Sequence, residues 1–229
     1  MLREIVFDTE TTGFDPAEGH KLVEIGAVEL INHIPTGKTY HQYINPCRDV
    51  PEEVVKVHGL TFEFLQNYPK LSEIAPDFIN FVGEDGILVA HNAQFDMNFI
   101  NYEFKHAGFE IYTNDRVVDT LEIAKKKFPG ARNNLDALCR RFNIDNSKRT
   151  KHGALLDAEL LSEVYLELLG GAEPSMKLEA VKQVEQKTED DVIVKKVRVV
   201  RKFDVSEEEQ NQHESFLKDN LKEAIWLNL

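Results

Sequence analysis

The stretch IVFDTETTG, residues 5–13, joins an apolar run to two carboxylates and a turn that ends at glycine. On a β-strand, side chains two residues apart point to the same side, so Asp8 and Glu10 face a common point, about 6–7 Å from each other. Two carboxylates this close repel each other unless a cation lies between them, and a divalent ion bound by oxygen atoms fits that place. A solvated strand end with two unrelated acids is the alternative interpretation of this stretch alone.

The composition is that of a soluble globular protein. The 229 residues include 42% apolar and 29% charged residues, which suits one well-packed domain with an appendage. No apolar run approaches the length of a membrane-spanning helix, and the chain enters a strand at once, so we expect neither a membrane segment nor a signal peptide. Cys47 and Cys139 lack metal-ligand spacing, and we expect two reduced thiols in a cytoplasmic protein.

The formal net charge is −13. A protein that holds duplex DNA by neutralising phosphates is normally basic. If this chain acts on nucleic acid, we therefore expect metal ions to screen an acidic site and another subunit to hold the polymer.

The order of predicted elements indicates an α/β fold. The first strand, residues 22–30 and residues 38–44 form an antiparallel meander, with Pro35-Thr36-Gly37 as the turn before the third strand. Further strands are predicted at 86–90 and 116–118, and helices at 51–59, 72–82 (capped by Ser72), 95–106, 120–127, 134–142 and 154–169. A meander followed by strand–helix units predicts a mixed five-stranded sheet with helices packed on its faces.

Beyond Gly171 the sequence becomes polar and charged. We predict a domain over residues 1–171, a flexible linker over 172–190 and a partner-binding tail over 191–229. A terminal helix over 206–227 combines a Ser206–Glu209 capping box with an apolar stripe and the lone tryptophan; these side chains are Phe216, Leu217, Leu221, Ala224, Ile225 and Trp226. A helix folded back on the domain is the alternative for this segment.

Two later stretches supply further acids. Asp96 follows a buried strand and enters a helix, while His152 precedes a helix whose first turns contain Asp157. Asp157 lies in an apolar stretch, where an unpaired carboxylate is costly unless a cation matches it; a core aspartate bonded to backbone amides remains the alternative. Four acids and a histidine are the parts of two-metal phosphoryl transfer, with the histidine as general base.

These residues carry a family resemblance. Asp8-Thr9-Glu10, Asp96 in residues 91–96, and His152 with Asp157 resemble the three motifs of DEDD-type 3′–5′ exonucleases. A histidine five residues before the last aspartate is typical of their histidine subclass. Residues 145–150 and 163–166 look like the epsilon family, the proofreading exonuclease subunits of bacterial DNA polymerase III. The resemblance implies an RNase H-like fold for residues 1–171 and recurs in the tail.

The resemblance also implies roles for individual residues. Asp8, Glu10 and Asp157 would be direct ligands of two divalent ions, Mg²⁺ or Mn²⁺, with Asp96 helping to hold the second ion and His152 as general base. The residues implied to contact the substrate are Glu10, Glu53, His58, Asn92 and Phe95. Two of these have structural alternatives, since His58 is also suited to end a helix and Phe95 to fill a core.

The implied reaction is removal of the 3′-terminal nucleotide of DNA, with release of a nucleoside 5′-monophosphate and a preference for frayed, mismatched ends. The implied partners are the polymerase (alpha) subunit, bound through the tail, and a small accessory subunit. Glu173 to Leu178 resembles a weak sliding-clamp motif, although glutamate and leucine replace its usual glutamine and aromatic residue. The alternatives are an RNA-trimming exoribonuclease of the same superfamily and a scaffold that has lost activity.

Overall fold

The computed structural model describes residues 1–171 and 206–220. Contacts divide the chain into two units, Met1–Lys177 and Leu178–Leu229, and the described part of each is treated separately. The predicted linker, the clamp-like Glu173 to Leu178 and the tail residues from Leu221 to Trp226 lie outside the described residues.

The first unit is built on one five-stranded sheet with the strand order β3-β2-β1-β4-β5. The strands are β1 (Arg3–Thr11), β2 (Leu22–Ile31), β3 (Ile34–Tyr43), β4 (Ile87–Ala90) and β5 (Val117–Asp119). β1 pairs antiparallel with β2 and parallel with β4, and β4 pairs parallel with β5. The predicted mixed five-stranded sheet is therefore confirmed.

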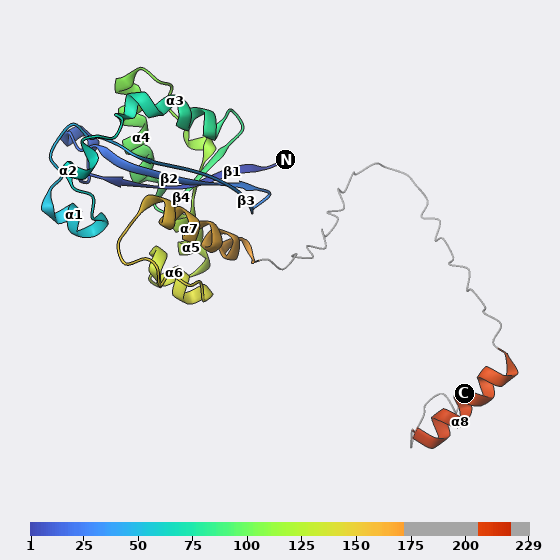
Figure 1. Cartoon of the computed structure of the whole chain (residues 1–229). Helices are drawn as coiled ribbons and strands as arrows, with labels where there is room; N and C mark the ends of the chain where they lie inside the picture. The colour runs from blue at the N-terminus through green and yellow to red at the C-terminus, as the bar shows by residue number, and fades with distance from the viewer. Residues whose placement is uncertain (172–205, 221–229) are drawn as a thin grey trace, which may run out of the picture. The chain divides into compact units, whose positions relative to one another are not determined.

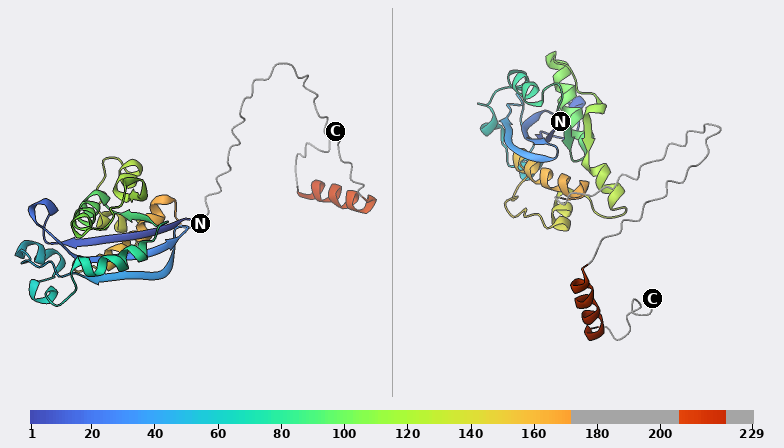
Figure 2. Two further views of the ribbon diagram at one scale, coloured as in Figure 1. Left: turned by 90° about the horizontal axis from the view of Figure 1, so that it is seen from above. Right: turned by 90° about the vertical axis from the view of Figure 1, so that its right-hand side faces the viewer.

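Helices cover both faces of this sheet (Figure 1). α3 (Leu71–Val82) and α4 (Ala93–Ala107) lie on one face, and α5 (Thr120–Lys127), α6 (Leu135–Phe142) and α7 (Ala154–Leu169) on the other. The right-hand view of Figure 2 places the green α4 and the orange α7 on opposite sides of the blue strands. α1 (Glu52–His58) and α2 (Phe62–Leu65) lie at the end of the sheet where β1 finishes, and short 3-10 turns occur at Pro16–Glu18 and Asn114–Arg116.

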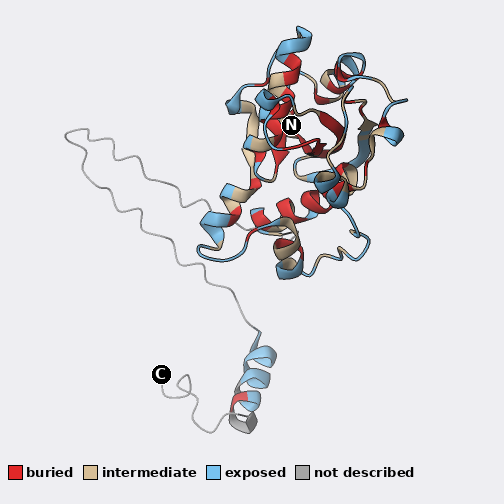
Figure 3. Cartoon of the chain, turned by 90° about the vertical axis from the view of Figure 1, so that its left-hand side faces the viewer, coloured by how far each residue is buried: buried red, intermediate tan, exposed pale blue. Residues whose placement is uncertain are grey.

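Alternate residues of β1 pack against different layers. Ile5 and Phe7 belong to the core formed with α3 and α4, whereas Val6 packs against side chains of α7 such as Leu161. Figure 3 shows the resulting buried centre of the sheet in red. Because the strand repeat is two residues, Asp8 and Glu10 share the side of Val6 and face α7.

Two local predictions were wrong. The hairpin turns at Asn32-His33, both with positive φ, which is the two-residue turn whose twist matches a hairpin. The predicted turn residues Pro35, Thr36 and Gly37 lie instead within β3, an edge strand where proline is tolerated. Ser72 does not cap α3 either, because the helix begins at Leu71 and its N-cap is Lys70. The backbone N–H of Lys70 donates to Glu73 Oε2 at 2.7 Å.

The described part of the second unit is α8 (Glu207–Asn220). The predicted capping box is present, since Glu209 N donates to Ser206 Oγ at 3.3 Å and Ser206 N donates to Glu209 Oε2 at 3.2 Å. Over the two described ranges, no helix combines the length and the apolar character that crossing a membrane requires.

Candidate active site

Asp96 is fixed to the end of β1 by side-chain and backbone hydrogen bonds. The Thr9 backbone N–H donates to Asp96 Oδ1 at 3.1 Å and the Thr9 hydroxyl donates to the same oxygen at 2.6 Å. Asp96 lies in the first turn of α4 and is 3% exposed. The strand that carries Asp8 and Glu10 therefore also holds the third carboxylate.

Asp157 reaches the same place because α7 begins directly against the sheet. Gly26 is the β2 partner of Asp8, and a Cβ at Gly26 would lie 2.1 Å from the backbone nitrogen of Leu155. Only a residue without a side chain allows the first turn of α7 this close to the sheet. Asp157, in that turn, is 3% exposed on the side that Asp8 and Glu10 face.

Two adjoining hollows meet at these acids. One encloses about 300 Å³ and the other about 270 Å³, and Asp8, His91 and His152 line both. The first is also lined by Thr9, Glu10, Thr11, Gly13, Phe14, Val54, Val57, His58, Phe95 and Asp96, and the second by Asn134, Leu135, Asp136, Arg149 and Asp157. The four predicted acids and the predicted base thus gather around one cleft.

Crowding and burial disfavour the charged forms of the acids. Burial, together with the nearby carboxylates of Asp96, Glu10 and Asp157, raises the pKa of Asp8 well above its ordinary value. Burial and the neighbouring Glu24 raise the pKa of Glu10 to about 8. Burial raises the pKa of Asp96 to about 7, against the hydrogen bonds that it accepts.

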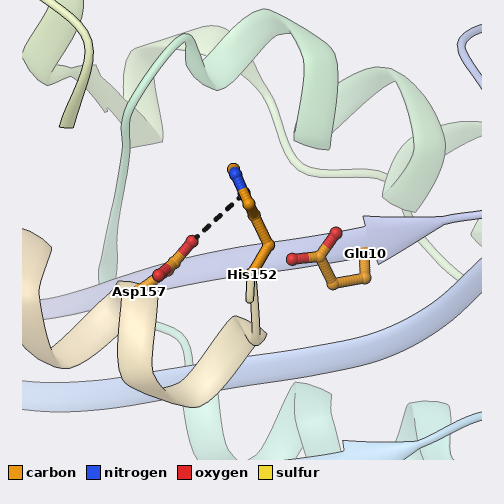
Figure 4. Close-up of side chains that lie close together, drawn as sticks. All are labelled: Glu10, His152 and Asp157. Atoms are coloured by element: carbon orange, nitrogen blue, oxygen red, sulfur yellow. Dashed lines mark ion pairs between the residues drawn. The ribbon is translucent and has the colours of Figure 1, made fainter. Parts of the chain in front are cut away.

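The donor set suits a divalent cation. Glu10, His152 and Asp157 each offer one ligand atom, and these atoms all lie within 4.8 Å of one another (Figure 4). Glu10 Oε1 is buried and has no hydrogen-bond partner among the described residues. A cation would satisfy that oxygen and offset the repulsion between the carboxylates, and oxygen-rich sites of this kind favour Mg²⁺ or Mn²⁺.

His152 is placed beside the carboxylates and is the most exposed member of the group. Its side chain is 47% exposed, and Nδ1 lies 3.6 Å from Asp157 Oδ2. Its backbone N–H donates to Val57 O in α1 at 3.2 Å. Burial and the Arg149 guanidinium lower the pKa of His152, so the ring is mainly neutral near pH 7 and able to accept a proton.

Comparison with known proteins agrees with this geometry. The exonuclease family matches residues 5–165. The DNA polymerase III subunit epsilon of Rickettsia felis is 45% identical over 97% of this chain and 99% of its own length. The chain belongs to the epsilon family of exonucleases. The corresponding subunit of Escherichia coli is 45% identical over 95% of this chain and 93% of its own length.

Solved structures support the fold. The nuclease domain of 3′hExo, a DEDDh family member bound to rAMP, superposes with a TM-score of 0.64 at 16% identity, covering 73% of this chain and 92% of that one. Membership of the epsilon family makes the chain a 3′–5′ exonuclease, and exonucleases of the DEDD type depend on divalent metal ions.

The structure separates the predicted substrate contacts of this epsilon-family chain into two groups. Glu10, His58 and Phe95 line the cleft. His58 Nδ1 accepts the backbone N–H of Leu60 at 3.0 Å, as a helix-ending histidine would, but its Nε2 is buried without a partner among the described residues. Glu53 and Asn92 are exposed and do not line either hollow, and their roles stay predictions.

Sequence reasoning missed four residues that line the cleft or act on its acids. Arg149 binds Asp157, His91 lines both hollows, Phe14 is 86% exposed at the rim, and Glu24 lies across from Glu10 in β2. A positive charge between two acidic motifs was the one available signal for Arg149. Nothing in the sequence indicated the other three, because their role depends on which strand or helix lies beside them.

Proposed function

We propose that this exonuclease proofreads newly made DNA, hydrolysing the 3′-terminal phosphodiester and releasing nucleoside 5′-monophosphates. The main observation behind this proposal is that one cleft is lined by Asp8, Glu10, Asp96, Asp157 and His152. Relatives named DNA polymerase III subunit epsilon match almost the whole chain, which supports DNA as the substrate and replication as the setting.

The proposed metal ligands are the carboxylates. Asp8, Glu10 and Asp157 would bind two divalent ions, Mg²⁺ or Mn²⁺, with Asp96 assisting at the second. When bound, the ions supply charge stabilisation to the attacking and leaving oxygens. The buried Glu10 oxygen that has no hydrogen-bond partner among the described residues and the raised pKa of Asp8 support this assignment.

His152 is proposed as the general base. It would remove a proton from the attacking water, whose oxygen bonds to phosphorus as the bond to the 3′ oxygen of the preceding nucleotide breaks. The lowered pKa keeps the ring neutral for this step. The exposed position of His152 lets it return the proton to solvent. The 3′ oxygen that leaves takes up a proton from solvent water.

His58 and Phe95 are proposed to hold the terminal nucleotide. With Nδ1 accepting from Leu60 N, neutral His58 carries its proton on Nε2, beside the Thr11 backbone, and would donate it to the nucleotide. Phe95 packs against Phe99 at a centroid distance of 5.2 Å while lining the cleft, so it serves both the core and the site. Glu53 and Asn92 stay as proposed outer contacts.

A cleavage assay tests the function directly. Mismatched 3′ DNA primers should be shortened in Mg²⁺, protected by chelator, and cleaved faster than paired primers or short RNAs. Preferential cleavage of RNA would favour the exoribonuclease alternative instead. Asp8→Asn should lower the rate at least about a hundredfold, because a metal ligand is lost, whereas Asp15→Asn, at an exposed position outside the cleft, should not; full activity of Asp8→Asn contradicts the assignment.

The tail is proposed to bind the polymerase subunit. A tethered exonuclease has a high effective concentration at the primer end even through a long connection. The alignment with the Rickettsia felis subunit extends over 97% of this chain, which includes the tail. A chain that stops at residue 171 should keep its nuclease activity but lose affinity for the polymerase alpha subunit, and unchanged affinity would refute a tail-borne site.

The remaining assignments are finer proposals. Glu173 to Leu178 would make a weak clamp contact, and failure of a clamp-binding peptide to displace this chain from the clamp would remove it. A small accessory subunit and a cytoplasmic location fit a replication subunit and are proposed on that ground alone.

A further inference from the structure

Arg149 makes a two-pronged contact with one of the proposed metal ligands. Its Nε donates to Asp157 Oδ1 at 2.6 Å and its Nη2 donates to Asp157 Oδ2 at 2.6 Å. The Arg149 side chain is 9% exposed and that of Asp157 is 4% exposed. Bidentate arginine–carboxylate pairs of this geometry are among the stronger charged contacts in proteins.

The same guanidinium reaches two further groups of the site. Nη1 donates to Asp136 Oδ1 at 3.1 Å, and Nη2 lies 2.9 Å from His152 Nδ1. Asp136 is in the first turn of α6, and its side chain is 40% exposed. Arg149 therefore keeps a second carboxylate partner, nearer to solvent, in addition to Asp157.

The Arg149 guanidinium and a divalent ion that bind the same Asp157 carboxylate weaken each other's binding. A guanidinium does not lose its proton at any physiological pH, and like charges a few ångströms apart repel strongly where water is excluded. One oxygen of Asp157 also lies within 4.8 Å of ligand atoms of Glu10 and His152, where the ions are proposed to bind. A bound dication would thus weaken the Arg149 contact, and the Arg149 contact would weaken binding of the dication.

We propose that Arg149 is the internal counter-ion of the metal site: it neutralises Asp157 in the metal-free chain and competes with divalent ions for that carboxylate. This inference rests on the proposed metal ligands. Arg149 is a positioning residue, acting through Asp157. A purely structural role predicts something different, namely that losing Arg149 destabilises the fold equally with and without metal and leaves metal affinity unchanged.

The test measures Mn²⁺ binding to the full chain by calorimetry, with Arg149→Gln as the variant. The dissociation constant should fall at least about fivefold, the lower end of usual coupling between two sites. The melting temperature should drop in chelator, and the drop should shrink in saturating Mn²⁺, which replaces the lost positive charge. Arg149→Lys keeps the positive charge but cannot make the bidentate contact. It should shift the dissociation constant in the same direction by a smaller factor.

Arg3→Gln is the matched control. Arg3 Nε donates to Glu29 Oε1 at 2.8 Å at the other end of β1, so this variant also breaks a largely buried arginine–carboxylate pair, but far from the cleft. It should lower the melting temperature equally in both conditions and leave Mn²⁺ affinity unchanged.

Two outcomes overturn the inference in distinguishable ways. An unchanged or higher dissociation constant in both Arg149 variants, with normal binding in the unsubstituted chain, would overturn competition while leaving the metal site intact. Absence of Mn²⁺ binding in the unsubstituted chain would overturn the proposed site and this inference together. Should Arg149→Gln fail to fold, Arg149→Lys alone decides between these results.

Discussion

Gly26 of β2 lies directly beneath Leu155 of α7, so that a Cβ on the glycine would come within 2.1 Å of the Leu155 backbone nitrogen. Asp8 is the β1 partner of Gly26, and Asp157 follows Leu155 by two residues. The closeness of strand and helix at this one point sets the distance between two carboxylates that are 149 positions apart in the sequence.

Gly26→Ala should therefore push the start of α7 away from the sheet. We expect a loss of about 1–3 kcal/mol in unfolding free energy from overpacking, together with loss of nuclease activity as Asp157 moves from Asp8. Thermal denaturation and primer cleavage measure the two effects. Gly153→Ala, in extended backbone with open space around it, should leave stability nearly unchanged, and equal stability of both variants would contradict the close-contact argument.

The metal-free protein should lose stability as pH rises above 6.5. The folded-state pKa values of about 7 for Asp96 and about 8 for Glu10 lie above those of the unfolded chain. The folded state thus binds more protons than the unfolded state, and its extra stability is lost as pH rises through these values. His58, His91 and His152 have lowered pKa values. Their opposite contribution ends within about one pH unit above the ordinary histidine value of about 6.5, so it offsets only the first part of this fall.

Melting temperatures in chelator between pH 6.5 and 9 check this expectation. A fall of at least about 3 °C is expected, since about 1 kcal/mol shifts a protein of this size by about 2–4 °C. Saturating Mg²⁺ should flatten the profile because bound ions favour the ionised carboxylates. A melting temperature that is constant or rises with pH in chelator would show that the acids are not destabilised as described.

His152→Gln should lower the maximal rate about 10²–10⁴-fold, the usual contribution of a general base. It should also remove the acidic limb of the pH–rate profile, which in the unsubstituted enzyme lies below pH 6.5 because burial and Arg149 lower the pKa of His152. Steady-state rates from pH 5 to 9 provide the measurement. Survival of the acidic limb in the variant would assign it to another group.

Two substitutions at His58 separate its structural bond from its proposed substrate contact. Asparagine places an oxygen near the position of Nδ1 and can accept the Leu60 N–H, whereas glutamine reaches the position of Nε2. His58→Asn should keep the melting temperature and raise KM about tenfold, the value of one hydrogen bond of about 1.4 kcal/mol. His58→Gln should do the reverse, and an unchanged KM in His58→Asn would leave His58 as a helix-ending residue only.

Much of the fold was predictable because its signals are local. The apolar run into Asp8-Thr9-Glu10, the buried run of β4 and the glycine that ends α4 correspond to elements found in the structure. The hairpin was misplaced since Pro35 and Gly37 are strong turn residues by themselves, yet strand pairing selected Asn32-His33. Pairing energy along two strands outweighs the preference of a few residues for a turn.

The sequence by itself determined which chemical groups the site contains and that Asp8 and Glu10 face one side, because strand periodicity and motif spacing are properties of a single segment. Only the tertiary structure decided three contacts. Thr9 binds Asp96, Gly26 leaves room for the start of α7, and Arg149 binds both oxygens of Asp157. Each of these contacts joins segments separated by other elements. Their distances, and the pKa shifts that follow from burial, arise only when the layers pack together.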